Sequence, residues 1–318
     1  CGEEETKLAL AEGNGNNNWR KIVRGEAEKM ASECPAVTEF TYTDGQGEVQ
    51  KEISNIEGLT AQGYGAVVIF PDSGKALLPA VTKMYQAGVV TVPYRIELGG
   101  EEGVNYSHFV STSFKQAGEL WGEWLLEALP KGGKVLNLGG PAGNSGGVEE
   151  SEGLDAVLGS HPEFEFIGEQ PFIPTDWEPA KVQQVLTASL AKYPEIDAIT
   201  TDFGSAFASA LPAFKQAGRE VPALTTEDSN LLSCEQQKIG FPMFTTASQT
   251  WHVRRAIEFA VSEATGGQVP TSTIVPQKAF ENSITGKPNP VTCKANLGPE
   301  AIDSTLLTDK EMAEALKR

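Results

Sequence analysis

The stretch Ala66–Phe70 (Ala-Val-Val-Ile-Phe) constrains the fold most, because it is a short strand-forming run without a polar residue at alternate positions. Such a run is typical of a strand that is covered on both faces, as in a parallel sheet. The turn Pro71–Gly74 and a helical pattern over Lys75–Gln86 follow it. A strand, a turn and a helix in this order predict a parallel α/β layer.

The same alternation runs through most of the chain. In the first half, the patterns predict strands at Lys7–Ala11, Val37–Thr43 and Val89–Val92, and helices at Trp19–Ala31, Val49–Gln62 and Phe114–Leu129. In the second half, they predict strands at Lys134–Leu138, Phe164–Gln170, Ile196–Thr200 and Val221–Thr225, and helices at Val148–Leu158, Pro179–Ala191, Ser205–Gln216 and Trp251–Thr265. We therefore expect an α/β protein with two doubly wound, Rossmann-like lobes.

Length also favours two lobes, since 318 residues exceed what one hydrophobic core usually supports. The turns Gln86-Ala87-Gly88 and Gln216-Ala217-Gly218 each end a helix and lead into a strand, which suggests two similar halves. The late helix is expected to return to the first lobe, so that the chain crosses the hinge several times. The expected boundaries are a leash over 1–6, an N-terminal lobe over 7–111 plus 249–272, and a C-terminal lobe and tail over 112–248 plus 273–318.

The composition excludes several functions. A formal net charge of −18 disfavours nucleic acid, whose phosphates attract lysine and arginine, and favours a neutral or cationic ligand. No window of 18 consecutive apolar residues is present. The cysteine and histidine spacings fit neither a zinc nor a redox site, so we expect no metal and no cofactor.

The four cysteines bear on the compartment. Cys1, followed by Gly2 and an acidic run, resembles the start of a mature bacterial lipoprotein, in which this cysteine carries the lipid. Cys234 and Cys293 lie in late, turn-like segments and are candidates for a disulfide in an oxidising compartment, which would leave Cys34 over. We therefore expect an extracytoplasmic protein that is anchored through Cys1.

The turns after the predicted strands carry the candidate ligand-binding residues, because ligands of open parallel sheets bind beyond the carboxyl ends of the strands. These residues, together with Glu150 on the helix after the glycine-rich turn, are amides, carboxylates, one guanidinium and aromatic rings: Asn16, Asn18, Trp19, Tyr94, Arg95, Asn144, Trp177, Asp202, Phe203, Asp228 and Gln249. The mixture suits a neutral polyhydroxylated ligand, whose hydroxyls both donate and accept hydrogen bonds and whose apolar faces pack on rings. Helix capping is the alternative role for about half of the polar residues.

Several of these segments resemble the ribose-binding-protein branch of the periplasmic sugar-binding proteins, which have the type I periplasmic-binding-protein fold. The similar segments are LALAEGNGNNNWRKIVRGEAEKMA, VVTVPYR, GNSGGVEESEGLDAVL, TDW and TTDFGSAFASALPAFKQAGREVPALTTEDSN. The resemblance implies that Arg95 and Asp228 bind the sugar and that Trp177 stacks on it.

The sequence departs from this family at three of the positions. Tyr94 stands where the family usually has Asp, Glu150 lies where a second ligand-binding Arg is frequent, and Phe203 falls where an Asn is frequent. Fewer cations and more acids argue against an acidic sugar and leave pentoses, hexoses and sugar alcohols open. The resemblance implies a monomer that is not an enzyme: the solute-binding component of an ABC importer, which closes over a neutral sugar or sugar alcohol and presents it to the membrane permease.

Other classes remain as alternatives. Gly143–Gly147 fits the G-x-S-x-G motif of α/β hydrolases, with Ser145 as nucleophile, Asp202 or Asp228 as acid and His252 as base. A dinucleotide enzyme is disfavoured, because Asn18 stands where the third glycine of the phosphate-binding motif is needed. A repressor-type effector domain would need a DNA-binding segment before the first strand. A receptor-coupled sugar sensor would use the same site.

Overall fold

The computed structural model describes residues 1–318, which form two compact units. Unit 1 comprises Cys1–Thr112, Gln249–Val275 and Thr305–Arg318; unit 2 comprises Ser113–Ser248 and Pro276–Ser304. The chain passes from one unit to the other after Thr112, Ser248, Val275 and Ser304. None of the helices is both long and apolar enough to cross a membrane.

Unit 1 is built on a six-stranded parallel sheet with the order β12-β5-β4-β3-β1-β2. Its strands are β1 (Thr6–Glu12), β2 (Val37–Asp44), β3 (Ala66–Phe70), β4 (Val90–Arg95), β5 (Val110–Thr112) and β12 (Ile274–Val275). All five residues of β3 are buried, as the apolar run predicts. The strand order reverses between β1 and β3, which makes their carboxyl ends the expected ligand site of this sheet.

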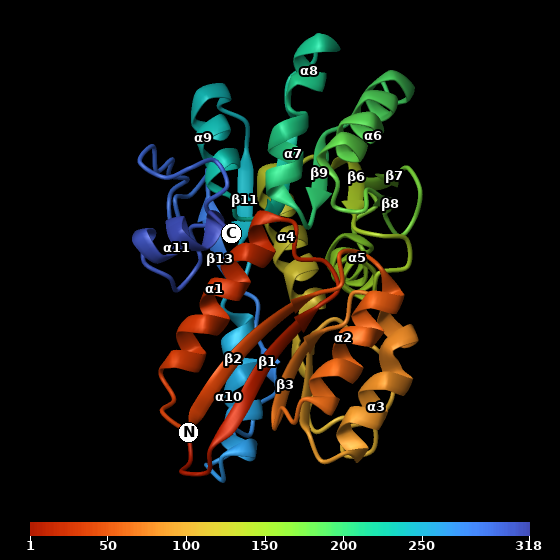
Figure 1. The fold of residues 1–318 in the computed structure, drawn as a ribbon. Coiled ribbons are helices and arrows are strands. Elements are labelled where there is room, and N and C mark those ends of the chain that lie inside the picture. The colour runs from red at the N-terminus through yellow and green to blue at the C-terminus, as the bar shows by residue number, and fades with distance from the viewer. The chain divides into compact units, whose positions relative to one another are not determined.

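Helices cover both faces of this sheet (Figure 1). The helices of unit 1 are α1 (Asn18–Ser32), α2 (Val49–Ala61), the 3₁₀ turn η1 (Gly74–Leu77), α3 (Leu78–Gln86), α10 (His252–Ala264) and α11 (Asp309–Leu316). The pair α2 and α3 packs on one face, over a core that includes Ala9, Val67 and Ile69. The pair α1 and α10 packs on the other face, so the sheet is doubly wound as expected.

Unit 2 repeats the plan on a seven-stranded sheet with the order β13-β11-β10-β9-β6-β7, with β8 beside β6. Its strands are β6 (Gly133–Gly139), β7 (Phe164–Ile167), β8 (Ile173–Pro174), β9 (Ala198–Thr201), β10 (Ala223–Glu227), β11 (Met243–Thr246) and β13 (Ala279–Asn282). All pairs are parallel except β11 with β13. The strand order reverses between β6 and β9.

The strands of unit 2 place successive apolar side chains in two separate cores. Its helices are α4 (Phe114–Ala128), α5 (Ser145–Leu158), α6 (Pro179–Lys192), α7 (Gly204–Ala210), α8 (Pro212–Gln216) and α9 (Asn230–Ile239). Val135 joins the core under α4 and α5, whereas the next residue, Leu136, joins the core on the opposite face with residues of α6 and α7. This alternation is the period of two that a strand imposes on its side chains.

Two local predictions concern helix ends. Gly88 (φ +87°) and Gly218 (φ +66°) both have left-handed backbones, so the two Gln-Ala-Gly turns are helix stops of the expected kind. The helix predicted over Ser205–Gln216 is divided into α7 and α8, because Pro212 has no N–H to donate to the preceding turn.

The two ends of the chain differ from the expectation. Thr305–Arg318 belongs to unit 1, not to the C-terminal lobe, because α11 packs on α1 and its Glu311 pairs with Lys29 (2.9 Å). Residues 1–6 do not form a free leash: the backbone N–H of Glu4 donates to Thr265 O (3.1 Å), and Thr6 begins β1.

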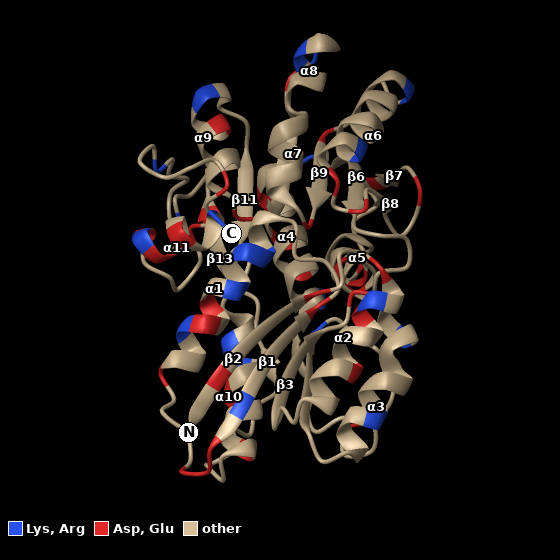
Figure 2. Ribbon diagram, viewed as in Figure 1, with Lys and Arg blue, Asp and Glu red and all other residues tan.

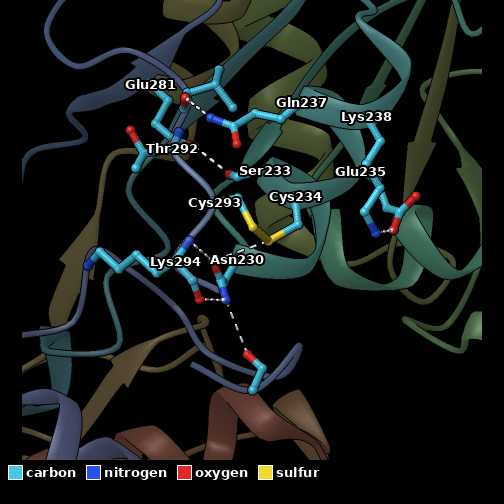
Figure 3. The surroundings of a disulfide bond; sticks show 12 residues. Asn230, Ser233, Cys234, Glu235, Gln237, Lys238, Glu281, Thr292, Cys293 and Lys294 are labelled. Carbon is cyan, nitrogen blue, oxygen red and sulfur yellow. Dashed lines mark hydrogen bonds and ion pairs between the residues drawn. A yellow bond between two sulfur atoms is a disulfide. The ribbon is translucent and has the colours of Figure 1, made fainter. Parts of the chain in front are cut away.

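The cysteines form two disulfides. Cys234 pairs with Cys293, which joins α9 to the segment after β13 (Figure 3). Cys1 pairs with Cys34, so Cys34 is not left over and the sulfur of Cys1 is occupied in this structure. This second pair was not predicted from the sequence, because the sulfur of Cys1 was assigned to the lipid.

Acidic and basic side chains are interspersed along the helices of both units (Figure 2). The acidic residues behind the net charge of −18 therefore occur in both units.

Candidate functional site

The β1–α1 loop (Gly13–Asn17) lies at the point where the strand order of unit 1 reverses. Its first four backbone N–H groups are bound by side chains of the unit itself. Gly13 and Asn14 both donate to Asp72 Oδ2 (2.8 and 3.1 Å), and Gly15 donates to Asp44 Oδ1 (3.0 Å). Asn16 donates to the side chain of Asn14 (3.1 Å). In a phosphate-binding loop, such backbone N–H groups bind an anionic group of the ligand. Here, the N–H groups of Gly13, Asn14 and Gly15 bind carboxylates of the protein itself.

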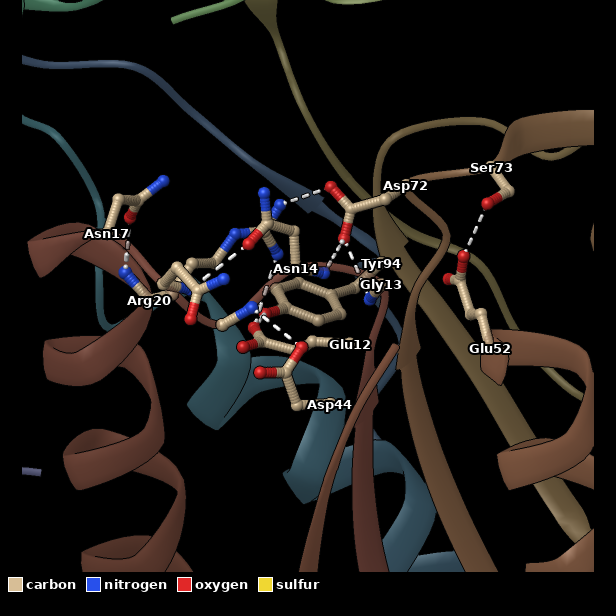
Figure 4. A network of polar contacts seen from close by, with 12 residues as sticks. Glu12, Gly13, Asn14, Asn17, Arg20, Asp44, Glu52, Asp72, Ser73 and Tyr94 are labelled. Atoms are coloured by element: carbon tan, nitrogen blue, oxygen red, sulfur yellow. Dashed lines mark hydrogen bonds and ion pairs between the residues drawn. The ribbon is translucent and has the colours of Figure 1, made fainter. Parts of the chain in front are cut away.

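A buried charge network lies directly beneath this loop (Figure 4). The guanidinium of Arg20 donates to Glu12 Oε1 (3.2 Å) and to Asp72 Oδ1 (2.7 Å). Glu12 also accepts from the hydroxyls of Tyr42 (3.1 Å) and Tyr94 (3.2 Å). These contacts satisfy the buried carboxylate of Glu12 and the buried cation of Arg20, as buried charges require, whereas Asp72 lies at the solvent-accessible edge of the network.

Burial governs the titration of this network. Burial raises the pKa of Glu12 to about 7, although Arg20 lowers it, and burial also raises the pKa of Asp72. Burial lowers the pKa of Arg20, but the charges of Asp72 and Glu12 raise it more, so the guanidinium stays protonated. One arginine thus serves two carboxylates, and the network carries no excess positive charge for an acidic ligand.

Trp19 lies between two guanidinium groups and an aromatic ring. Arg20 and Arg95 lie 5.2 and 5.0 Å from the centre of its ring, and Phe70 contacts it edge-on at 5.9 Å. Arg20 also lies 3.3 Å from the centre of the Phe70 ring. The structure therefore brings together Trp19 and Arg95, two of the residues that the sequence predicts, at the carboxyl ends of β1 and β4.

The remaining predicted residues of unit 1 differ in exposure. Asn16 is exposed and Asn18 is half-buried, whereas Tyr94 and Gln249 are fully buried. Tyr94 supports Glu12, and the side chain of Gln249 accepts from the hydroxyl of Thr112 (2.7 Å). In this structure, Asn16 and Asn18 are the polar side chains of the set that solvent reaches most.

In unit 2, Trp177 and Asp202 meet where the strand order reverses. The indole Nε1 of Trp177 donates to Asp202 Oδ2 (2.7 Å). Its ring packs directly on Gly140, just after β6, where an added Cβ would lie 2.3 Å from the indole. A side chain at position 140 would collide with the indole, so the ring can lie here only because this residue is glycine.

Asp228, just after β10, is buried and already holds three hydrogen bonds. Its Oδ1 accepts from Ser248 N (2.7 Å) and Ser304 Oγ (2.6 Å), and its Oδ2 accepts from Ser304 N (2.9 Å). Burial raises the pKa of its carboxyl, which these three donors lower. Asp228 therefore ties the segment before Thr305 to the carboxyl end of the sheet.

Of the other predicted residues of unit 2, Asn144 and Phe203 lie at helix starts and Glu150 lies inside a helix. Asn144 caps α5 by accepting from Gly147 N (3.1 Å), as the capping alternative predicts. Glu150 is buried on α5. Phe203 precedes α7 and packs against the core of its face.

Sequence reasoning missed Glu12, Arg20, Phe70, Asp72 and Ser304. Phe70 and Asp72 end the buried run and begin the turn that opened the sequence argument, so the rule of strand ends applies to them equally. Glu12 ends β1 in the same way. Ser304 had no such signal, because it lies in a segment without periodicity.

The residues of the hydrolase alternative have other roles. His252 is fully buried beside Tyr94 (5.7 Å between ring centres), and burial lowers its pKa to about 3, with Arg95 lowering it further. Ser145 is the first residue of α5, Asp202 accepts from Trp177, and Asp228 is bound by serines. The geometry of a base-activated serine is not supported.

The chain matches the family described as "Periplasmic binding protein domain" over residues 9–268. It belongs to this family. Its sequence is 27% identical over 214 residues to the ribose import binding protein of Haemophilus influenzae, covering 67% of this chain and 70% of that protein. The xylitol-binding protein of Mycolicibacterium smegmatis is 22% identical over 182 residues, 57% of this chain and 50% of that protein.

The fold of this periplasmic binding protein agrees with solved structures. The Caulobacter myo-inositol binding protein bound to myo-inositol superposes with a TM-score of 0.76 at 19% identity, over 86% of this chain and 93% of that chain. The expected type I periplasmic-binding-protein fold and the likeness to the ribose-binding type are therefore confirmed.

Proposed function

We propose that this chain is the extracytoplasmic solute-binding protein of an ABC importer and that it binds a neutral sugar or sugar alcohol. The β1–α1 loop carries this proposal. Because its backbone N–H groups are bound by Asp72, Asp44 and Asn14, it offers a ligand amide side chains and an indole rather than an anion-binding nest. Hydroxyl groups both donate and accept, and they match such a surface.

Among neutral polyols, we propose a pentose or a sugar alcohol. The relatives that carry the names of ribose and xylitol support this class, as does the solved structure with myo-inositol. We further propose ligand-binding roles for Asn16, Asn18, Trp19 and Arg95 of unit 1 and, separately, for Trp177, Asp202 and Asp228 of unit 2.

Calorimetry and thermal shift against a panel of ligands test this function. The panel contains ribose, xylitol, myo-inositol, glucuronate and ribose 5-phosphate. A ligand that binds only the native state raises the melting temperature. We expect a rise with at least one neutral compound and none with the two anions. A rise with ribose 5-phosphate alone would sink the proposal, because the loop amides would then have to release their carboxylates.

Transport requires a permease and a location outside the cytoplasm. We propose that the protein works as a monomer and is not an enzyme, which the family membership supports. Deletion of its gene should abolish uptake of the radiolabelled ligand in the host, and expression of the gene should restore it. Uptake that persists unchanged would assign the ligand to another binding protein.

Lipid attachment at Cys1 is part of the same proposal, but it competes with the disulfide to Cys34 for one sulfur atom. The mature protein can therefore carry one of them and not both. Mass spectrometry of the protein from its host, before and after reduction, separates the two. An anchored protein shows a lipid mass on Cys1 and a free thiol on Cys34.

A further inference from the structure

The carboxylate of Asp72 is the point at which the β1–α1 loop meets the charge network. Asp72 Oδ2 accepts from the N–H groups of Gly13 and Asn14, while Oδ1 accepts from Arg20. Asp72 lies two residues beyond β3, and Gly13 directly follows β1. The two strands between which the order reverses are thus joined at their carboxyl ends through this one side chain.

We propose that Asp72 is a positioning residue for ligand binding, which sets the conformation of the loop that carries Asn16, Asn18 and Trp19. The inference rests on the proposed function, since it assigns the placement of those side chains to a residue outside the predicted set. Asp72 acts through the loop backbone and through Arg20.

The loop depends on such a support because it has little structure of its own. An added Cβ on Gly13 would lie 2.5 Å from Asp72 Cβ and 2.7 Å from Glu52 Oε2, so the loop is fitted closely against these two side chains. Glu52 in turn accepts from the hydroxyl of Ser73 (2.6 Å), which follows Asp72. The turn after β3 and the loop after β1 therefore form one hydrogen-bonded unit.

The second path from Asp72 runs through Arg20 to the indole. The ion pair of 2.7 Å holds one end of the guanidinium, and Glu12 holds the other (Figure 4). The face of this guanidinium covers Phe70 and lies near Trp19. Loss of Asp72 would leave Arg20 with one carboxylate and would free both the loop and the cation beside Trp19.

Glu26 supplies a matched control within unit 1. Like Asp72, it accepts from one arginine and two other donors: Arg254 Nε (2.5 Å), Thr305 Oγ1 (2.5 Å) and Leu306 N (2.8 Å). It is fully buried on α1 and holds the segment before α11 rather than the loop. Removing it should cost stability in the same way without moving the ligand-binding residues.

The test compares Asp72→Ala, Asp72→Asn and Glu26→Gln in the full chain. For the neutral polyol that the wild type binds, we expect Asp72→Ala to raise the Kd at least tenfold. Asp72→Asn should raise it less, because its amide oxygen still accepts from the loop. The ratio of the Kd values for two polyols that differ at one hydroxyl should also change in Asp72→Ala, whereas Glu26→Gln should lower the Tm and leave both quantities within twofold.

Hydrogen exchange supplies a readout that does not need a ligand. In Asp72→Ala, the amides of Gly13 and Asn14 should exchange faster while the strands of unit 1 keep their protection; in Glu26→Gln the loop should stay protected. Equal affinity and equal loop exchange in Asp72→Ala and wild type would overturn the inference. If the wild type binds no polyol in the panel, the proposed function fails, and the exchange of the loop still decides whether Asp72 positions it.

Discussion

Five residues other than glycine have a positive φ, and three of them belong to the candidate site: Arg95 (67°), Trp177 (56°) and Gln249 (52°). A left-handed backbone costs a residue with a Cβ about 1–2 kcal/mol. Such a conformation persists only where the surrounding contacts determine it, and it is concentrated at functional sites. The strain at these positions therefore agrees with their assignment to ligand binding.

The indole of Trp177 allows a sharp test at this scale. Trp177→Phe keeps a ring on Gly140 but loses the hydrogen bond to Asp202, so we expect the Kd for the ligand to rise several-fold; Trp177→Ala should raise it at least tenfold, about 1.4 kcal/mol. Calorimetry measures both. Trp124 is the control, because its Nε1 also donates within unit 2, to Asn282 (3.2 Å), but it lies in the core with Phe244. Trp124→Phe should lower the Tm and leave the Kd unchanged.

Alanine substitutions at two glycines should have different effects, one on ligand binding and the other on stability. Gly13→Ala should weaken ligand binding at least tenfold, because the new methyl group would collide with Asp72 and Glu52. Gly58→Ala should raise the unfolding free energy by about 0.5–1 kcal/mol, since Gly58 lies inside α2 and an added Cβ would meet only Gln62 Nε2, at 3.7 Å, which is an ordinary contact distance. Chemical denaturation and calorimetry on both variants check this pair. A Gly13→Ala variant with wild-type affinity would show that the loop tolerates displacement.

At the scale of elements, the Cys234–Cys293 disulfide holds the segment after β13 on α9. Asn230 and Gln237 of α9 add hydrogen bonds to Lys294 and Val291 of that segment (Figure 3). The disulfide joins residues that are 59 apart in the sequence. For a loop of that length, we expect the double variant Cys234→Ser/Cys293→Ser to lose roughly 2–4 kcal/mol of unfolding free energy. Urea unfolding without reductant measures this loss. An unchanged midpoint would mean that the hydrogen bonds alone hold the segment on α9.

Helices and strands could be predicted where apolar residues recur with a regular period along the sequence. The apolar run of β3 and the Gly88 and Gly218 stops gave correct elements, since burial on two faces and a left-handed turn leave clear signals. Helix α11 was missed, although Thr308 and Glu311 form a capping box that the sequence displays. The Asp72 network was missed for another reason: its members come from separate segments of the sequence, and only the parallel sheet brings the ends of β1 and β3 together.

At the scale of the molecule, buried acids predict an unusual dependence of stability on pH. Burial raises the pKa of Glu281 to about 7, against hydrogen bonds from Thr292 N (2.8 Å) and Ser233 Oγ (2.8 Å); Asp228 and Asp303 raise it further. The unfolded chain titrates this group near pH 4.5. The folded state therefore binds more protons between these values, and the stability from Glu281 is lost as pH rises.

Lowering the pH from 8 to 6 should accordingly raise the unfolding free energy by about 1 kcal/mol through Glu281 alone. Burial raises the pKa of Glu12 and Glu52 to about 7 as well, so they act in the same direction. Denaturant titrations at the two pH values measure the sum. In Glu281→Gln, the change in unfolding free energy between the two pH values should be smaller by the contribution of Glu281. An equal change in the variant and the wild type would mean that another group binds the proton.

The four passages of the chain between the units have a consequence for biosynthesis. Residues of unit 2 end at Ser304, whereas unit 1 also needs Thr305–Arg318, which is translated after all of unit 2. Within it, α11 packs on α1, which precedes all of unit 2 in the chain. Glu26 on α1 therefore gains the hydrogen bond from the hydroxyl of Thr305 only after unit 2 has been translated. Translation of unit 1 therefore begins before that of unit 2 and is completed after it.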